Sequence, residues 1–221
     1  MKLKRIRVAI DSPAASGAGT ISKKLAKHYN LLYCDTGKIY RFFALKFIEK
    51  KVKNKIKYLS KISKKINLKK LENKNLLNDK IAYMASQIAK DLKIRKIALK
   101  FQKKIAYNPP AKYFGSVLDG RDICSVVLPD ADIKFYITAQ VKVRAKRRYR
   151  EYQKLGKKVK FSEILKSMKK RDGDDRNRAH SKLKKTRDSY LINTTNLSIK
   201  SSFLKVKKIM DSETSKIWKK Q

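Results

Sequence analysis

The first apolar stretch of the chain predicts a buried strand that leads into a tight loop. Residues 6–10 are apolar and rich in β-branched side chains, and the run ends at Asp11. A segment of small residues follows, and from Thr20 the apolar positions Ile21 and Leu25 recur at helical spacing. The beginning of the chain therefore predicts a strand, a loop and a helix in succession.

The same alternation continues along the rest of the chain. Short apolar runs predict further strands at 31–34, 114–118, Ile133–Thr138 and 190–192. Helical spacing predicts helices at 39–48, at 79–108 with an interruption near residue 91, and at 144–155, 162–171 and 199–210. Strands that alternate with helices predict an α/β fold with a parallel sheet covered on both faces. Ligands of such sheets bind beyond the carboxyl ends of the strands.

Residues 49–80 interrupt this alternation. The segment is rich in lysine and asparagine, and its apolar positions keep roughly helical intervals: Val52, Ile56, Leu59 and Ile66. We interpret the segment as a surface insertion. The 221 residues, 42% of them apolar, suffice for one compact core and leave no room for two large domains, so we expect one folded unit.

Composition argues against several classes of protein. No run approaches the roughly 18 consecutive apolar residues that a membrane span requires, and residues 1–7 lead into the first strand without the apolar region of a signal peptide. Cys34 and Cys124 are too few for a disulfide framework, and His28 and His180 stand apart, so we expect no metal cage. We therefore expect a cytoplasmic protein without a membrane partner.

The formal net charge is +41, from 59 basic and 18 acidic residues. Such a balance is typical of nucleic-acid-binding proteins. Lysine dominates the basic set and accompanies isoleucine and asparagine throughout the chain, as a biased genomic composition would produce. This distribution favours a general compositional bias over RNA or DNA binding. A polyanionic substrate would still be attracted by such a field.

The small residues after the first strand occupy the place of a phosphate-binding loop. The segment consists of Ser12, Pro13, Ala14, Ala15, Ser16, Gly17, Ala18, Gly19 and Thr20. Small side chains let successive backbone N–H groups converge on a phosphate, and the start of the helix adds partial positive charge. Compared with the pattern G-x-x-x-x-G-K-[ST], Ser12 replaces the first glycine and Ala18 the phosphate-binding lysine. The loop alone fits both an ATP site and a strand-to-helix turn without a ligand.

Four further clusters follow the loop along the chain. They are D-T-G-K-I-Y-R at 35–41, A-S-Q-I-A at 85–89 followed by Arg95, D-G-R-D at 119–122, and R-D-G-D-D-R-N-R at 171–178. Together with the loop they resemble bacterial cytidylate kinase over roughly 5–48 and 78–210. The resemblance implies a P-loop NTPase-type α/β fold and an ATP-dependent kinase, with Mg²⁺ and with CMP or dCMP as the acceptor. It also implies a core at 1–48, 79–142 and 186–221, a reduced monophosphate-side insertion at 49–78, and a lid at 143–185.

Several arginines of these clusters suit a phosphate. Arg41, about one helical turn beyond Thr36, and Arg121, at a strand end, could each fork onto a monophosphate. The resemblance implies that both arginines hold the phosphate of CMP and that Thr36 belongs to the same site. Arg171 and Asp175 lie about one turn apart and could grip a ribose diol. Surface salt bridges and an exposed ion-pair ladder are the alternatives.

Four residues are candidates for recognising the base. Asp122 and Ser86 can accept or donate hydrogen bonds at its Watson–Crick edge, and Arg95 can donate to a pyrimidine. The resemblance implies that these three residues read cytosine together with Arg178. An ordinary helix serine is the alternative for Ser86.

The arginines Arg144, Arg147 and Arg148 lie together on the predicted helix 144–155. The i,i+4 spacing lets Arg144 and Arg148 point together toward a triphosphate, and similar arginines in the family belong to a lid that closes over ATP. We expect Arg144, Arg148 and Arg121 to be catalytic by stabilising charge, and Thr20 to contact Mg²⁺. A solvated arginine face is the alternative.

The alanine at position 18 bears on activity. Removal of one preorganised charge typically costs on the order of a hundredfold in rate. We expect Arg144 or Arg148 to compensate, whereas Lys23 and Lys24 project sideways from the loop. Three functions stay open: an active (d)CMP kinase, which we favour and expect to be a monomer; a nucleotide-binding protein without turnover; and a nucleic-acid-binding protein.

Overall fold

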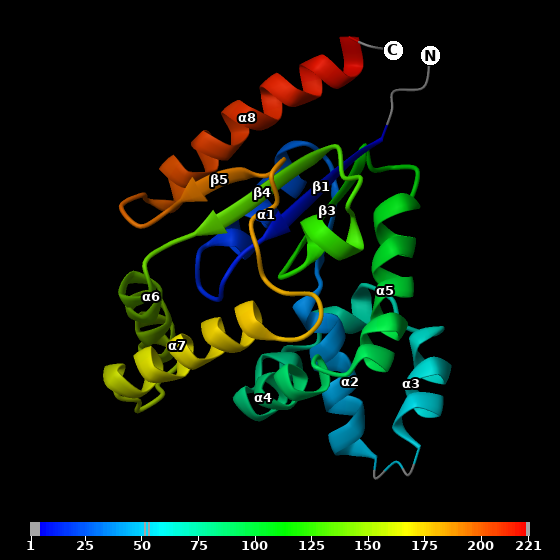
Figure 1. Cartoon of the computed structure of the whole chain (residues 1–221), viewed down its shortest axis with the longest axis vertical. Coiled ribbons are helices and arrows are strands. Elements are labelled where there is room, and N and C mark those ends of the chain that lie inside the picture. The colour runs from blue at the N-terminus through cyan, green and yellow to red at the C-terminus, as the bar shows by residue number, and fades with distance from the viewer. Residues whose placement is uncertain (1–4, 51, 53, 220–221) are drawn as a thin grey trace.

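The chain folds around a five-stranded parallel β-sheet (Figure 1). The structure is a computed structural model and describes residues 5–50, 52 and 54–219; residues 1–4, where we expect no targeting signal, lie outside the described residues. The strands are β1 (Ile6–Asp11), β2 (Leu32–Asp35), β3 (Gly115–Gly120), β4 (Ile133–Thr138) and β5 (Tyr190–Asn193). They are arranged in the order β2-β3-β1-β4-β5, and each neighbouring pair runs parallel. The predicted α/β fold class is confirmed.

The helices lie close to the predicted positions. They are α1 (Ala18–His28), α2 (Gly37–Glu49), α3 (Lys55–Ser63), α4 (Asp79–Ile88), α5 (Leu92–Tyr107), α6 (Val141–Lys154), α7 (Phe161–Asn177) and α8 (Ile199–Lys219). The predicted interruption near residue 91 is confirmed, because the Asp91 side chain accepts hydrogen bonds from Lys93 N (2.7 Å) and Ile94 N (3.3 Å) and so caps the start of α5. α1 begins earlier than predicted, at Ala18, and α8 continues beyond its predicted end.

Helices cover both faces of the sheet, because successive residues of a strand point to opposite faces. Val8 and Ile10 of β1 belong to a core cluster with residues of α1 and α8. Ala9, between them, belongs to the other core cluster, with residues of α2, α4 and α5. The long helix α8 therefore lies along one face, and α2 and α5 lie on the opposite side of the sheet (Figure 1).

The interpretation of 49–80 as a surface insertion is wrong for its apolar residues. The segment, described except at residues 51 and 53, contains α3 and two 3₁₀ turns, η1 (Lys69–Glu72) and η2 (Lys74–Leu77). Leu59, Leu71 and Leu76 are buried in the cluster that also contains α2. The many lysines between these leucines are exposed and obscured the pattern, so the segment is an integral part of the core on the α2 side.

Two helical groups project from the carboxyl ends of the strands. In the first group, α6 and α7 pack against each other around Ala145, Ile164 and Met168. The second group contains α4 (Figure 1). The Tyr152 hydroxyl of α6 donates to Asp79 Oδ1 of α4 at 3.0 Å, and Lys157 forms an ion pair with the same carboxylate. None of the helices in the described part of the chain is both long and apolar enough to cross a membrane.

Candidate active site

The segment from Ser12 to Gly17 forms a compact loop between β1 and α1. Gly17 has φ +93°, in the left-handed region that favours glycine, and Ala15 has φ +58°. The Ser16 hydroxyl accepts from Ala18 N at 3.3 Å, and Ser12 N donates to Gly120 O at 3.1 Å. The loop is therefore joined to the end of β3, and the amino terminus of α1 faces the carboxyl edge of the sheet, where an anion is favoured.

A second set of contacts, which the sequence did not indicate, braces the loop from the side of β5. The Thr194 hydroxyl donates to Ser16 O at 2.8 Å, and Thr194 is buried. Arg147 Nη1 donates to Ser16 O at 3.2 Å and to Thr194 Oγ1 at 3.1 Å, and its Nη2 donates to Thr194 O at 2.7 Å. The loop thus has the end of β5 and an arginine of α6 as its immediate neighbours.

Arg144 and Arg148 do not point together, contrary to the expectation from their spacing. The Arg144 side chain is 2% exposed and pairs with Asp172 of α7, while its Nε donates to Ala139 O at 2.7 Å and its Nη1 to Ala14 O at 3.1 Å. Arg148 instead pairs with Glu151 at 3.0 Å. A solvated arginine face is also wrong for Arg144, because burial and four acceptors fix its guanidinium in place.

Four arginines converge at the carboxyl edge of the sheet. Burial and repulsion from Arg121, Arg41 and Arg148 lower the pKa of Arg171 to about 10. Burial and repulsion from Arg148 and Arg121 likewise lower the pKa of Arg41, whose Nη1 donates to Leu76 O at 3.0 Å. The Nε of Arg171 is buried and has no hydrogen-bond partner among the described residues. Desolvated cations that repel one another create a binding site for an anion.

Asp175 is the carboxylate at the border of this cluster. It accepts from Arg121 Nε at 3.0 Å, and its Oδ1 lies 3.8 Å from Arg178 Nη1. Arg121 lies on a different segment of the sequence from Asp175 and Arg178, and the structure brings them together. Arg178 Nη2 is buried without a hydrogen-bond partner among the described residues, so the guanidinium has unused donor capacity.

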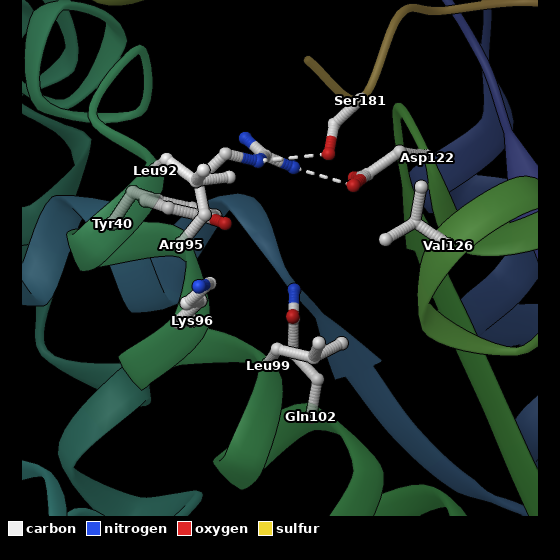
Figure 2. Close-up of a pocket in the computed structure, with 9 residues that line it drawn as sticks. All are labelled: Tyr40, Leu92, Arg95, Lys96, Leu99, Gln102, Asp122, Val126 and Ser181. Carbon is white, nitrogen blue, oxygen red and sulfur yellow. Dashed lines mark hydrogen bonds and ion pairs between the residues drawn. The ribbon is translucent and has the colours of Figure 1, made fainter.

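Arg95 and Asp122 form a buried pair next to the cluster (Figure 2). Arg95 Nη2 lies 2.5 Å from Asp122 Oδ2, its Nε donates to Ser181 Oγ at 3.0 Å, and its guanidinium lies 5.4 Å from the centre of the Tyr40 ring. The pair borders a cavity of about 60 Å³ into which the Gln102 amide points (Figure 2). The Gln102 Nε2 is buried and unpartnered within the described structure, and sequence pattern alone did not single this residue out.

Ser86 is placed differently from the other candidates for base recognition. It lies on α4, and its hydroxyl donates to Tyr83 O of the same helix at 2.6 Å. The contact is an ordinary intrahelical one. Thr36, in contrast, is buried at the start of α2 and donates through Oγ1 to Asp119 O at 2.8 Å, which joins the ends of β2 and β3.

An acidic pair lies beside the start of α1, and the sequence analysis assigned it no role. Asp119 is buried, accepts from the Tyr33 hydroxyl at 3.2 Å, and has one carboxylate oxygen without a hydrogen-bond partner among the described residues. Burial and repulsion from Asp35 raise its pKa. A Cβ added at Gly19 would lie 3.4 Å from Asp119 Oδ2, so the acid closely approaches the phosphate loop. The exposed Thr20 follows on α1.

Asp11, at the end of β1, supports the turn that carries Arg121 and Asp122. Its carboxylate accepts from Ile123 N at 2.7 Å and from Cys124 N at 2.9 Å. Burial raises the pKa of Asp11 to about 6, although these backbone donors act in the opposite direction. Asp11 therefore holds the turn that follows Arg121 and Asp122 in place.

Comparisons with known proteins agree with this geometry. The family model for cytidylate kinase matches residues 8–212. The chain is 42% identical over 206 residues to a cytidylate kinase of Bartonella tribocorum, covering 91% of this chain and 92% of that protein. It is 38% identical over 205 residues to one of Mesorhizobium japonicum, covering 92% and 93% of the two chains.

A solved structure of an uncharacterized protein from Eubacterium ventriosum is similar in fold. It superimposes with a TM-score of 0.54 at 20% identity and covers 94% of this chain and 99% of its own. The fold, the order of the motifs and the sequence similarity along almost the whole chain lead to one assignment: the chain belongs to the cytidylate kinase family.

Proposed function

We propose that the chain transfers the γ-phosphoryl group of ATP to CMP or dCMP, giving ADP and CDP or dCDP. The observation that carries the proposal is the convergence of Arg41, Arg121 and Arg171 at the carboxyl edge of the sheet, next to the Arg95–Asp122 pair. A phosphate dianion bound there would relieve the repulsion that lowers the pKa of Arg171. Membership of the cytidylate kinase family supports the same reaction.

The acceptor nucleotide lies along this row of residues in our proposal. Arg41 and Arg121 hold its phosphate through forked hydrogen bonds, and Thr36 belongs to the same phosphate site. Asp122 accepts from the 4-amino group of cytosine, and Arg95 donates to the ring acceptors. Uracil has a carbonyl in place of that amino group, and it would face the Asp122 carboxylate unfavourably.

The remaining acceptor-side residues complete the site. Asp175 and Arg171 hold the ribose, and Arg178 adds a donor on the base side because its Nη2 has unused capacity. Ser86 requires a rotation of its hydroxyl away from Tyr83 O to reach the base. We assign it the most peripheral role of the four base-recognition residues.

The donor nucleotide occupies the loop of residues 12–20, whose backbone N–H groups and helix terminus suit its phosphates. The donor set beside the loop fits Mg²⁺, because Asp119 offers an unpartnered carboxylate oxygen, Asp35 adds a second acid, and Thr20 adds a hydroxyl. When bound, Mg²⁺ neutralises and orients the phosphate oxygens.

Phosphoryl transfer requires the protein mainly to position the two nucleotides and to stabilise the negative charge of the phosphates. An oxygen of the CMP phosphate attacks the γ-phosphorus, and the bond to the β,γ-bridging oxygen breaks, so that ADP leaves. Arg121 and Arg148 stabilise the charge on the transferring group. Arg144 acts as a positioning residue, because its guanidinium is occupied by Asp172 and Ala14 O. The α6–α7 lid excludes water.

We propose that the protein acts as a monomer. The substrates are small nucleotides, and the proposed setting is the cytoplasm. The alanine at position 18 gives one specific reason to consider a protein that binds nucleotides without turnover. CMP binding measured together with ADP release separates the two functions, because only the kinase both binds CMP and consumes ATP.

A coupled assay of ADP release tests the proposal with ATP, Mg²⁺ and one monophosphate at a time. We expect turnover with CMP and dCMP and much less with UMP, AMP or GMP. The variant Arg41→Gln should raise the KM for CMP by about tenfold or more, because a charged fork is lost. Binding of CMP without any ADP release would favour the non-catalytic alternative.

A further inference from the structure

The phosphate loop of this chain lacks a cation of its own. Ala18 occupies the first position of α1, and its side chain is 3% exposed and ends in a methyl group. Phosphoryl transfer benefits from a positive charge held against the β- and γ-phosphates. If the proposed function holds, another side chain must deliver that charge.

Two of the arginines on α6 are committed elsewhere. Arg144 is buried against the carboxylate of Asp172 and against the backbone, so its charge is already neutralised. Arg148 pairs with Glu151 and lies close enough to Arg41 and Arg171 to lower their pKa values, which places it on the acceptor side.

The charges of the α1 lysines face other groups. Lys23 lies one turn beyond Gly19, and its charge lowers the pKa of Asp119, so it faces the end of β3. Lys24 lies 5.8 Å from the centre of the Phe203 ring, on the α8 side of the helix. The first turn of α1 therefore offers no direct replacement among these residues.

Arg147 of α6 also contacts the loop, and unlike Arg144 it has no carboxylate partner among the described residues. Its Nη1 lies 3.2 Å from Ser16 O and within 4.0 Å of the position that a Cβ on Gly17 would occupy. All of its hydrogen-bond acceptors are neutral: Ser16 O, Thr194 O and Thr194 Oγ1. Within the described residues it forms no ion pair with a carboxylate. The half-buried guanidinium therefore carries an uncompensated charge beside the amino terminus of α1.

We infer that Arg147 supplies the triphosphate-binding cation that position 18 lacks in this chain. The two Nη1 bonds, at 3.1 and 3.2 Å, are at the long end of the normal range, so an anionic oxygen is a better acceptor than either carbonyl or hydroxyl. Rotation of the long side chain moves the guanidinium from the wall of the loop to its phosphate-facing side. Burial and the nearby Arg144, which lower the pKa of Arg147, act with this preference for an anion.

A double-mutant cycle between Arg147→Gln and Ala18→Lys tests the inference. In the natural background, Arg147→Gln should lower kcat by about a hundredfold and leave the KM for CMP nearly unchanged. The lysine in Ala18→Lys should take over the role, so in that background Arg147→Gln should lower kcat by less than about tenfold. Arg150→Gln, an exposed arginine on the same helix, is the matched control and should change kcat in neither background.

Equal losses of kcat in the two backgrounds would show that Arg147 only braces Ser16 and Thr194, and would overturn the inference. An unchanged kcat in Arg147→Gln would overturn it as well. Thermal unfolding of each variant checks folding. If Ala18→Lys does not fold, Arg147→Lys provides the second test. Because this variant retains the positive charge, it should recover at least about a tenth of the kcat that Arg147→Gln loses.

Failure of the proposed function can be told apart from failure of this inference. If the natural chain releases no ADP with any monophosphate, binding of the non-hydrolysable ATP analogue AMP-PNP with Mg²⁺ replaces kcat as the measurement. Arg147→Gln should then weaken AMP-PNP binding by about tenfold or more, and Arg150→Gln should not. Equal affinities of the two variants would overturn the role of Arg147.

Discussion

Arg144 of α6 and Asp172 of α7 form a buried bidentate ion pair, and the same guanidinium donates to Ala14 O of the phosphate loop. One side chain therefore connects α6 and α7 with the loop between β1 and α1. This relationship explains why a lid arginine that the sequence analysis assigned to the triphosphate is 2% exposed in the structure. Its contribution is to set the position of the lid relative to the loop.

Loss of one partner of this pair should destabilise the protein strongly. Arg144→Met leaves the Asp172 carboxylate buried without its partner, and such changes typically cost about 3–5 kcal/mol of the free energy of unfolding. Chemical denaturation of the variant measures the loss. Arg150→Gln, on an exposed part of the same helix, should stay within about 0.5 kcal/mol of the natural chain. A loss below about 1 kcal/mol for Arg144→Met would contradict a structural role for the pair.

Asp122→Asn should weaken the preference for cytosine. In the proposed site the carboxylate would accept from the amino group of cytosine, whereas an amide could also donate to the carbonyl of uracil. We expect the ratio of kcat/KM for CMP over UMP to fall by about tenfold or more, on the scale of one charged hydrogen bond. Initial rates with the two monophosphates provide the ratio. Loss of activity with both substrates at a constant ratio would show that Asp122 only positions Arg95.

Asp79→Asn should loosen the contact between the lid and α4. The Asp79 carboxylate accepts from Tyr152 and pairs with Lys157, and these interactions lower its pKa. Because the contact is exposed, the free energy of unfolding should change by less than about 1 kcal/mol. The KM for CMP should rise a few-fold, since closure over the acceptor is weakened. Glu213→Gln, which removes an ion pair within α8, is the control and should leave the KM unchanged.

Asp11 should make stability depend on pH between about 4 and 6. Its folded-state pKa of about 6 lies above the ordinary value of 3.8, so the folded state binds the proton more tightly than the unfolded state. The stabilisation by this proton is complete below about pH 4 and is lost as the pH rises through 6. The difference in free energy of unfolding between the natural chain and Asp11→Asn should therefore fall by about 2 kcal/mol between pH 4 and pH 7. Urea denaturation across that range measures it, and a constant difference would contradict the raised pKa.

Much of the fold could be predicted from the sequence because strong local patterns coincide with buried strands. The run at 6–10 and the helix that follows it are regular, and both recur in β1 and α1. The segment 49–80 was harder, because its leucines are separated by exposed lysines and its turns are 3₁₀ rather than α-helical. Burial of Leu59 and Leu76 depends on contacts with α2, which no local pattern reveals.

The parts of the site that lie in sequence motifs could be predicted. The parts that depend on contacts between distant side chains could not. Arg41 and Arg121 follow β2 and β3, which are neighbours in the sheet, so their proximity could be predicted, whereas Arg171 lies on α7. The direction of Arg144 depends on Asp172, which lies on another helix. Spacing along a helix fixes which residues share a face, but it does not fix which of them finds a carboxylate.

Direct detection of CDP tests the central claim most directly. The natural chain is incubated with CMP, ATP and Mg²⁺, and the nucleotides are separated by ion-exchange chromatography. We predict that CDP and ADP appear in equal amounts and only when all three components are present. Absence of CDP from a folded chain that binds both nucleotides would contradict the assignment of phosphoryl transfer to this site.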